Sequence, residues 1–260
     1  MKTLPPFFLT RRLHALLVKV VLLCLAGMHC LQASAGIMVE RTRLIFEEGQ
    51  QERSLTLANT NDYPIIVQTW VDNGEGSSTP DAVVSVMMPL PGVFRLQPNE
   101  IMHLRVLYAN DPLPGDRESV FWLNLYEIPL LNSDRHAEQA RLLVGINTQI
   151  KIFYRPKNLP SSSGDVGRQL AFRLEKTGDG WVLVCYNRSP YFASFASLNM
   201  TVGDRHIETA QSPDMMTPPM SERRYSLSSP VSDVVAGGEV GYILIDDSGN
   251  FQQGSAALPR

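Results

Sequence analysis

Residues 142–156 read Leu-Leu-Val-Gly-Ile-Asn-Thr-Gln-Ile-Lys-Ile-Phe-Tyr-Arg-Pro, and they are more informative than any other stretch of the chain. Side chains two positions apart lie on the same face of a pleated strand. One face would therefore be apolar, while the other would carry polar groups that include a cation. The apolar positions are Leu142, Val144, Ile146, Ile150 and Ile152, and the cation is Lys151. The alternation predicts one long strand, and the pattern alone favours burial of its apolar face in the core of its own domain.

The same alternation recurs along the rest of the chain. Short segments of this kind follow one another about every 8 to 15 residues, with turn residues between them, and no segment of a dozen residues keeps a helical period. Besides 142–156, the expected strands are 41–46, 53–58, 65–72, 101–107, 119–126, 169–176, 181–186, 192–202, 224–227 and 239–246. Many short, regularly spaced strands predict β-sandwiches rather than helical layers.

A run rich in Pro, Ser and Gly separates two halves of the chain. It covers residues 156–164 and reads Pro-Lys-Asn-Leu-Pro-Ser-Ser-Ser-Gly. Such a run has little to bury and is typical of a linker. We therefore expect an all-β protein with two sandwich domains, residues 36–156 and 165–260, joined by a linker at residues 157–164.

The first 35 residues have the pattern of a secretory signal peptide. They contain four basic residues and no acid, then an apolar run over residues 20–28, then Ala33-Ser34-Ala35. The run is far shorter than the roughly 20 residues of a membrane-spanning helix. We expect cleavage after Ala35, export and no stable membrane insertion. Because four of the 23 basic residues leave with this segment and all 26 acids stay, the mature chain of 225 residues has a net charge of −7.

The mature sequence lacks the residue patterns of catalytic and metal sites. Its three histidines, His103, His136 and His206, are too dispersed for metal-ligand spacing, and no nucleophile elbow, P-loop or dinucleotide motif is present. Its single thiol, Cys185, lies in an apolar run and is expected to be a buried, inert side chain. We therefore expect no catalytic residue, no metal and no cofactor, and the absence of a basic stripe argues against nucleic acid as a partner.

Several segments resemble the periplasmic chaperones of the chaperone–usher pathway of pilus assembly, a two-domain immunoglobulin-like family. Two motifs carry most of the resemblance: Leu-Pro-Gly-Asp-Arg-Glu-Ser-Val-Phe-Trp-Leu-Asn at 113–124, and Ile-Lys-Ile-Phe-Tyr-Arg-Pro at 150–156. Shorter matches follow the family order at 40–43, 187–192, 216–221 and 245–249. The resemblance covers nearly all of residues 36–250 and implies two immunoglobulin-like β-sandwich domains, set at an angle with a cleft between them.

The resemblance also implies roles for particular residues. Arg43 and Lys151 match the two cleft cations that hold the carboxylate at the C-terminus of a pilin subunit, by charge-assisted hydrogen bonds. Leu142, Val144 and Ile146 match the apolar residues that such chaperones insert into the incomplete domain of a pilin, and the short loop at 130–141 resembles the short-loop subfamily. A charged trio that bridges the two domains in the family matches Glu118, Arg155 and Asp247.

The expected function is that of a non-enzymatic periplasmic chaperone. It would bind, fold and cap fimbrial subunits by donor-strand complementation and deliver them to an outer-membrane usher. An exposed apolar edge can also pair with a second copy, so self-association through this strand stays open. Two alternatives belong to other classes. A pilus subunit or adhesin of immunoglobulin-like fold would be expected to carry an N-terminal donor extension of alternating apolar residues, yet only Gly-Ile-Met-Val-Glu at 36–40 lies in the mature chain ahead of the segment with Arg43. A periplasmic hydrolase on a β-sandwich would need a nucleophile and a base, and the sequence shows no such constellation.

Overall fold

The structure is a computed structural model of the 260-residue chain, and it describes residues 19, 36–74, 85–130, 144–178, 180–228 and 237–259. Almost all of the predicted signal segment, its cleavage site and Leu142 lie outside these residues. All strands that the structure describes lie within Ile37–Arg260, which forms one unit of the chain. The described residues include no helix with the length and apolar character needed to cross a membrane.

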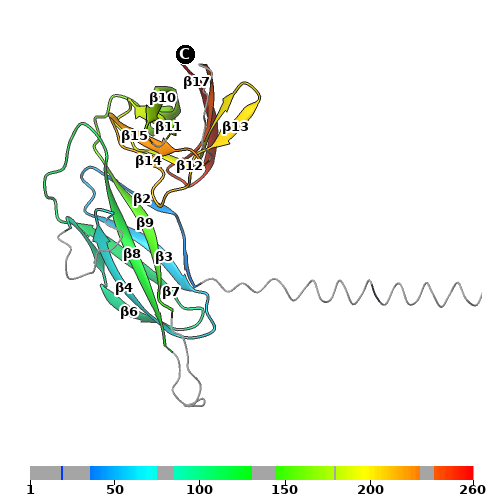
Figure 1. The fold of residues 1–260 in the computed structure, drawn as a ribbon. Coiled ribbons are helices and arrows are strands. Elements are labelled where there is room, and N and C mark those ends of the chain that lie inside the picture. The colour runs from blue at the N-terminus through cyan, green and yellow to red at the C-terminus, as the bar shows by residue number, and fades with distance from the viewer. Residues whose placement is uncertain are drawn as a thin grey trace, which may run out of the picture. The chain divides into compact units, whose positions relative to one another are not determined.

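Two sheets form the first sandwich (Figure 1). One sheet has the strand order β1–β3–β7–β5, with the bounds Ile37–Val39, Glu52–Asn59, Ile101–Tyr108 and Met87–Leu90. The other has the order β2–β9–β8–β4–β6, with the bounds Arg43–Glu47, Ile146–Arg155, Ser119–Pro129, Ile65–Asp72 and Val93–Leu96. Alternate side chains from both sheets meet between them, so that Leu55, Leu104, Leu123 and Ile152 are fully buried.

The chain changes sheets at its start, and this change places two cations side by side. β1 pairs with β3 in one sheet, and three residues later β2 pairs with β9 in the other. The β2–β9 pair is parallel, with Arg43 opposite Lys151 and Glu47 opposite Arg155. β2 reaches no further along β9 than Lys151, whereas β8 pairs with β9 from Ile146 to Tyr154. In the described part of the chain, the edge of β9 facing away from β8 therefore has no partner strand over residues 146–150.

The second sandwich begins with a short 3-10 helix, η3 (Ser163–Gln169). Its smaller sheet has the order β10–β11–β15, with the bounds Leu170–Thr177, Gly180–Asn187 and Ser221–Ser226. The larger sheet has the order β13–β12–β16–β17, with the bounds Arg205–Glu208, Ala193–Val202, Gly238–Ile245 and Phe251–Leu258, and β14 (Met216–Thr217) pairs with β12. Phe172, Leu183, Leu198 and Val240 fill the space between the sheets. Together the two sandwiches confirm the predicted all-β, two-domain architecture.

Gly254 makes room for an aromatic side chain of this second core. Gly254 is the register partner of Tyr242, and a Cβ at Gly254 would overlap the Tyr242 ring. The ring cannot move freely, because it stacks on Phe172 at 5.9 Å and its hydroxyl donates to the Gly167 carbonyl at 3.0 Å. We expect Gly254→Ala to lower the free energy of unfolding by about 1–3 kcal/mol, the usual cost of overpacking.

The measurement is the urea unfolding midpoint, and Gly115→Ala is the matched control. A Cβ at Gly115 meets no atom within 4 Å, so this variant is expected to stay within about 0.5 kcal/mol of the unmodified protein. Equal midpoints for the two variants would show that Tyr242 moves aside without cost.

The strand boundaries predicted from the sequence need several corrections. The segment 65–72 has the predicted bounds, but the strand expected at 142–156 is β9, Ile146–Arg155, and Val144 and Gly145 precede it without a ladder partner. The strand expected at 224–227 is Ser221–Ser226. Six strands were not predicted, namely β1, β5, β6, β13, β14 and β17. They are short, interrupted by Pro, or rich in polar and small residues, so their pairing partners rather than their own alternation decide their conformation.

Candidate functional site

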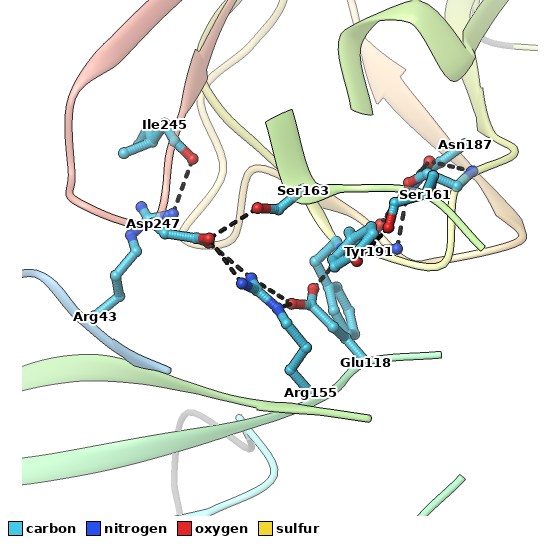
Figure 2. Close-up of polar contacts among 11 residues, drawn as sticks. Arg43, Glu118, Arg155, Ser161, Ser163, Asn187, Tyr191, Ile245 and Asp247 are labelled. Atoms are coloured by element: carbon cyan, nitrogen blue, oxygen red, sulfur yellow. Dashed lines mark hydrogen bonds and ion pairs between the residues drawn. The ribbon is translucent and has the colours of Figure 1, made fainter. Parts of the chain in front are cut away.

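Arg43 is a buried cation at the start of β2. Its residue is only 7% exposed, and its guanidinium lies 5.9 Å from the centre of the Phe153 ring. Nη1 donates to the carbonyl oxygen of Ile245 at 2.9 Å, while no group of the described residues accepts a hydrogen bond from the buried Nε. Burial lowers the pKa of Arg43, and the more distant carboxylates of Asp247 and Asp246 oppose that shift. Figure 2 shows Arg43 reaching toward the Ile245 carbonyl. The site thus contains a charged group with unused hydrogen-bonding capacity.

Lys151 is the neighbour of Arg43 across the β2–β9 ladder, and it already has an acidic partner. Its Nζ lies 3.3 Å from Oδ1 of Asp214, and its side chain is 23% exposed. The second carboxylate oxygen of Asp214 accepts from Nη1 of Arg223 at 2.8 Å. Burial lowers the pKa of Lys151, and the Asp214 carboxylate opposes this shift. The fold thus holds the two like charges of Arg43 and Lys151 opposite each other, with the Asp214 carboxylate beside one of them.

A cavity of about 240 Å³ adjoins Arg43. Its walls include the apolar side chains of Phe153 and Leu244, but charged and polar residues, among them Arg155 and Asp247, make up more of its surface.

Glu118, Arg155 and Asp247 are brought together by the fold (Figure 2). Arg155 donates from Nε to Oε1 of Glu118 at 2.8 Å, and from Nη1 and Nη2 to the two oxygens of Asp247, also at 2.8 Å. Glu118 also accepts from the backbone N–H of Phe192 at 2.9 Å, and Asp247 accepts from the hydroxyl of Ser163 at 2.8 Å. The guanidinium therefore forks between acids that are far apart in the sequence.

Burial and ion pairing act in opposite directions on the trio. Burial raises the pKa of Glu118 despite the nearby Arg155. For Asp247 burial also favours the neutral form, but the hydrogen bonds from Arg155 outweigh it and lower the pKa. The pKa of Arg155 is raised: burial opposes the charge, while the hydrogen bonds with Asp247 and the charge of Glu118 more than compensate. Such opposed effects are typical of a partly buried network, here with Glu118 buried and Asp247 at the exposed side.

The apolar face of the segment ending in β9 is divided between burial and exposure. Ile150 and Ile152 are 5% and 0% exposed and belong to the core of the first sandwich. Val144 and Ile146, which continue the same face toward the N-terminus, are 58% and 52% exposed. The exposed pair also adjoins the unpaired edge of residues 146–150. Exposed branched side chains beside unpaired backbone groups make a template for a further strand.

The opposite face of β9 is supported by amide side chains. Asn124 is 1% exposed, and its Oδ1 accepts from Asn147 at 2.9 Å and from Gln149 at 2.8 Å. Its Nδ2 donates to Oδ2 of Asp72 at 2.7 Å. This network ties β9 to β8 and β4 near the unpaired edge. Asn124 closes the sequence motif at 113–124, so the motif was the available signal, whereas nothing in the sequence around Asp214 or Arg223 indicates that they reach Lys151.

Within the described ranges, no group of three or more His, Cys, Asp and Glu side chains is arranged to hold a metal ion. Cys185 is fully buried, and burial raises the pKa of its thiol to about 12. At neutral pH this thiol stays protonated and is a poor nucleophile.

Two protein-family profiles match the chain. One is described as "Pili and flagellar-assembly chaperone, PapD N-terminal domain" and matches residues 36–160. The other is described as "Pili assembly chaperone PapD, C-terminal domain" and matches residues 165–256. Together these two matches span both sandwiches.

Individual relatives agree with these profiles. The chain is 31% identical to Chaperone protein FimC of Escherichia coli K12 over 231 residues, which cover 88% of this chain and 87% of the relative. The crystal structure of the YadV chaperone is similar with a TM-score of 0.71 at 27% identity, covering 86% of this chain and 100% of the other. The SafB chaperone of Salmonella enterica, solved in complex with SafA pilin, has a TM-score of 0.66, covers 86% of this chain and 96% of its own, and at 24% identity indicates a shared fold.

Proposed function

Because the chain belongs to the PapD family of pilus-assembly chaperones, a family that is not enzymatic, we propose that it acts in the periplasm and caps fimbrial subunits by lending them a strand. Delivery of the capped subunit to an outer-membrane usher completes the proposed role. One observation carries the proposal: the segment ending in β9 presents exposed apolar side chains and an unpaired edge at one end, and further along the strand the partly exposed Lys151 lies opposite the buried Arg43.

The exposed end provides what an incomplete pilin lacks. A pilin without its last strand has an open hydrophobic groove and unpaired backbone groups, and a donated strand satisfies both. Val144 and Ile146 would fill the groove, together with Leu142, which lies outside the described residues. Burying three such side chains contributes on the order of 5 to 8 kcal/mol before association costs are subtracted.

The cation pair would fix the register of that donation. A terminal carboxylate can accept hydrogen bonds from Arg43 and Lys151 together, and one anchored end decides which pilin residue lies beside which chaperone residue. The side chains of Val144 and Ile146 then reach particular positions of the groove. The distance along β9 between the anchor and the exposed pair is therefore part of the recognition.

Removal of either cation is the test of this proposal. Lys151→Ala or Arg43→Ala, co-expressed with a pilin encoded beside this chain, is expected to lose the soluble one-to-one complex. Truncating one member of a buried charge pair costs about 2–5 kcal/mol, or roughly 30-fold to several thousand-fold in affinity. The measurement is the amount of pilin that co-purifies from periplasmic extracts.

Lys176→Ala is the matched control, because Lys176 is an exposed lysine of β10 in the second sandwich. It is expected to retain the full pilin yield. Undiminished pilin yield with both Lys151→Ala and Arg43→Ala would remove the carboxylate-anchor mechanism. The alternative function, a pilus subunit or adhesin, is not favoured, because both family matches are to chaperone domains.

A further inference from the structure

The Lys151 ammonium lies beside a carboxylate of the protein itself. Asp214 lies in the segment between β13 and β14, far along the chain from β9. Its neighbour Met215 accepts a backbone hydrogen bond from Phe195 at 2.7 Å, which fixes this segment to β12. Oδ1 of Asp214 reaches Lys151 at 3.3 Å. Asp214 is therefore already paired with Lys151, one of the two cations proposed to bind the C-terminal carboxylate of a pilin.

Arg43 differs from Lys151 in this respect. Its guanidinium donates to a backbone carbonyl, and the acidic groups acting on it do so through longer-range attraction. Its Nε is buried and has no acceptor among the residues that the structure describes. The cation pair is thus half occupied: Lys151 faces a carboxylate, while Arg43 keeps unused donor capacity.

Asp214 has a second partner that can retain it. Oδ2 accepts from Nη1 of Arg223 at 2.8 Å, which is shorter than the 3.3 Å contact with Lys151. The Lys151–Asp214 pair is also partly open to solvent, with side-chain exposures of 23% and 33%. Partly exposed ion pairs are weak and easily exchanged. An incoming carboxylate could replace Asp214 as the partner of Lys151 while Asp214 stays paired with Arg223. Neither carboxylate would then be left without a cationic partner.

We propose that Asp214 is an internal competitor for the pilin carboxylate, bound to Lys151 in the free chaperone and held by Arg223 alone once the chain end arrives. The proposal rests on the carboxylate-anchor function of Lys151. Its consequence is selectivity: a ligand must displace Asp214, so a weakly held anion does not block the cleft. Only a chain end whose other contacts along β9 contribute affinity can complete the exchange.

The probe is a synthetic peptide of about 15 residues from the C-terminus of the co-expressed pilin, prepared with a free carboxylate or with a C-terminal amide. Asp214→Asn keeps the shape of the side chain and removes its charge. We expect it to bind the free-carboxylate peptide about tenfold more tightly than the unmodified chaperone, in the range of coupling between contacting groups, and to bind the amide peptide unchanged. Glu175→Gln removes one acid that pairs with Arg224, on the β10–β15 side of the second sandwich, and is expected to change neither affinity.

A double-mutant cycle separates competition from a merely structural role. With Arg223→Met, Asp214 loses its second partner and remains on Lys151, so peptide affinity is expected to fall about tenfold. In the double variant Asp214→Asn/Arg223→Met this loss is expected to disappear. Circular dichroism of each variant confirms that it is folded.

Equal or weaker binding by Asp214→Asn would overturn the proposal, and weaker binding would show that Asp214 orients Lys151 instead. Lys151→Ala serves as the reference for the underlying function. If Lys151→Ala abolishes peptide binding while Asp214→Asn leaves it unchanged, the anchor stands and the competitor role is wrong. If Lys151→Ala binds the free-carboxylate peptide as well as the unmodified chaperone does, the anchor itself is wrong and the competitor role falls with it.

Discussion

Val144→Glu and Ile146→Glu are each expected to abolish pilin capture while the free chaperone stays folded. Each variant loses the burial of one branched side chain, worth about 1.5–3 kcal/mol. It also places a carboxylate in an apolar groove, which costs several kcal/mol more. The sum corresponds to more than a roughly 1000-fold loss of affinity. The measurement is co-purification of pilin from the periplasm, followed by titration of the purified chaperone with the pilin.

Val144 and Ile146 are exposed in the free chaperone, so these substitutions test pilin binding separately from folding. Val144 and Ile146 are 58% and 52% exposed, so neither variant is expected to shift the thermal midpoint of the free chaperone. Met88→Glu is a matched control, since Met88 is equally exposed at 58% but lies on β5 in the other sheet. Ile152→Glu, on the buried part of the same face, is expected to unfold the protein. Unfolding of Val144→Glu, or full pilin capture by it, would show that this face is not donated.

Arg155→Ala is expected to produce the largest loss of stability among single changes at Arg43, Lys151 and the Glu118–Arg155–Asp247 trio. It removes the shared partner of Glu118, which is 4% exposed, and of Asp247. Breaking a buried ion pair from one side costs about 3–5 kcal/mol, because a buried charge is left without compensation. The measurement is the free energy of unfolding in urea at pH 7.

The deficit of Arg155→Ala is expected to shrink as the pH falls below about 5, near the ordinary carboxyl range. Burial already raises the pKa of Glu118, so the penalty of its charge is absent at low pH and grows as the pH rises through that pKa. The pKa of Asp247 is lowered, so its pairing with Arg155 stabilises the unmodified protein at any pH above the ordinary pKa of an aspartate. This contribution is lost as the pH falls through the lowered pKa. Both effects reduce the difference between variant and parent in acid.

Glu118→Gln is the control for the network, because the amide can keep the hydrogen bonds without a buried charge. We expect it to cost much less than Arg155→Ala. A deficit of Arg155→Ala that stays constant from pH 7 to pH 4 would show that the lost stability comes from packing of the arginine against Tyr191 rather than from the charges.

Much of the fold was predictable because the alternation of apolar and polar residues within a segment is enough to indicate a strand. The alternation at 65–72 predicted a strand with the observed bounds, and the motifs at 113–124 and 150–156 indicated the family that the two profile matches show. The weakly patterned strands β13 and β17 escaped prediction, because their partners in the sheet select them. The roles of Arg43, Lys151 and the Glu118–Arg155–Asp247 trio came from the resemblance and remain predictions, although the structure does bring each set together.

The two-residue period of a strand needs no knowledge of its surroundings, so the amino-acid pattern alone assigns the side chains of the strand ending at Arg155 to its two faces. Where the apolar face is buried and where it is open depends on packing against residues that are distant in the sequence. Core residues brought from elsewhere in the chain cover Ile150 and Ile152, whereas the residues that the structure describes leave Val144 and Ile146 more than half exposed. The same is true of Asp214, whose approach to Lys151 depends on how distant strands pair. Burial and charge pairing are properties of neighbours in space, and a local pattern does not contain them.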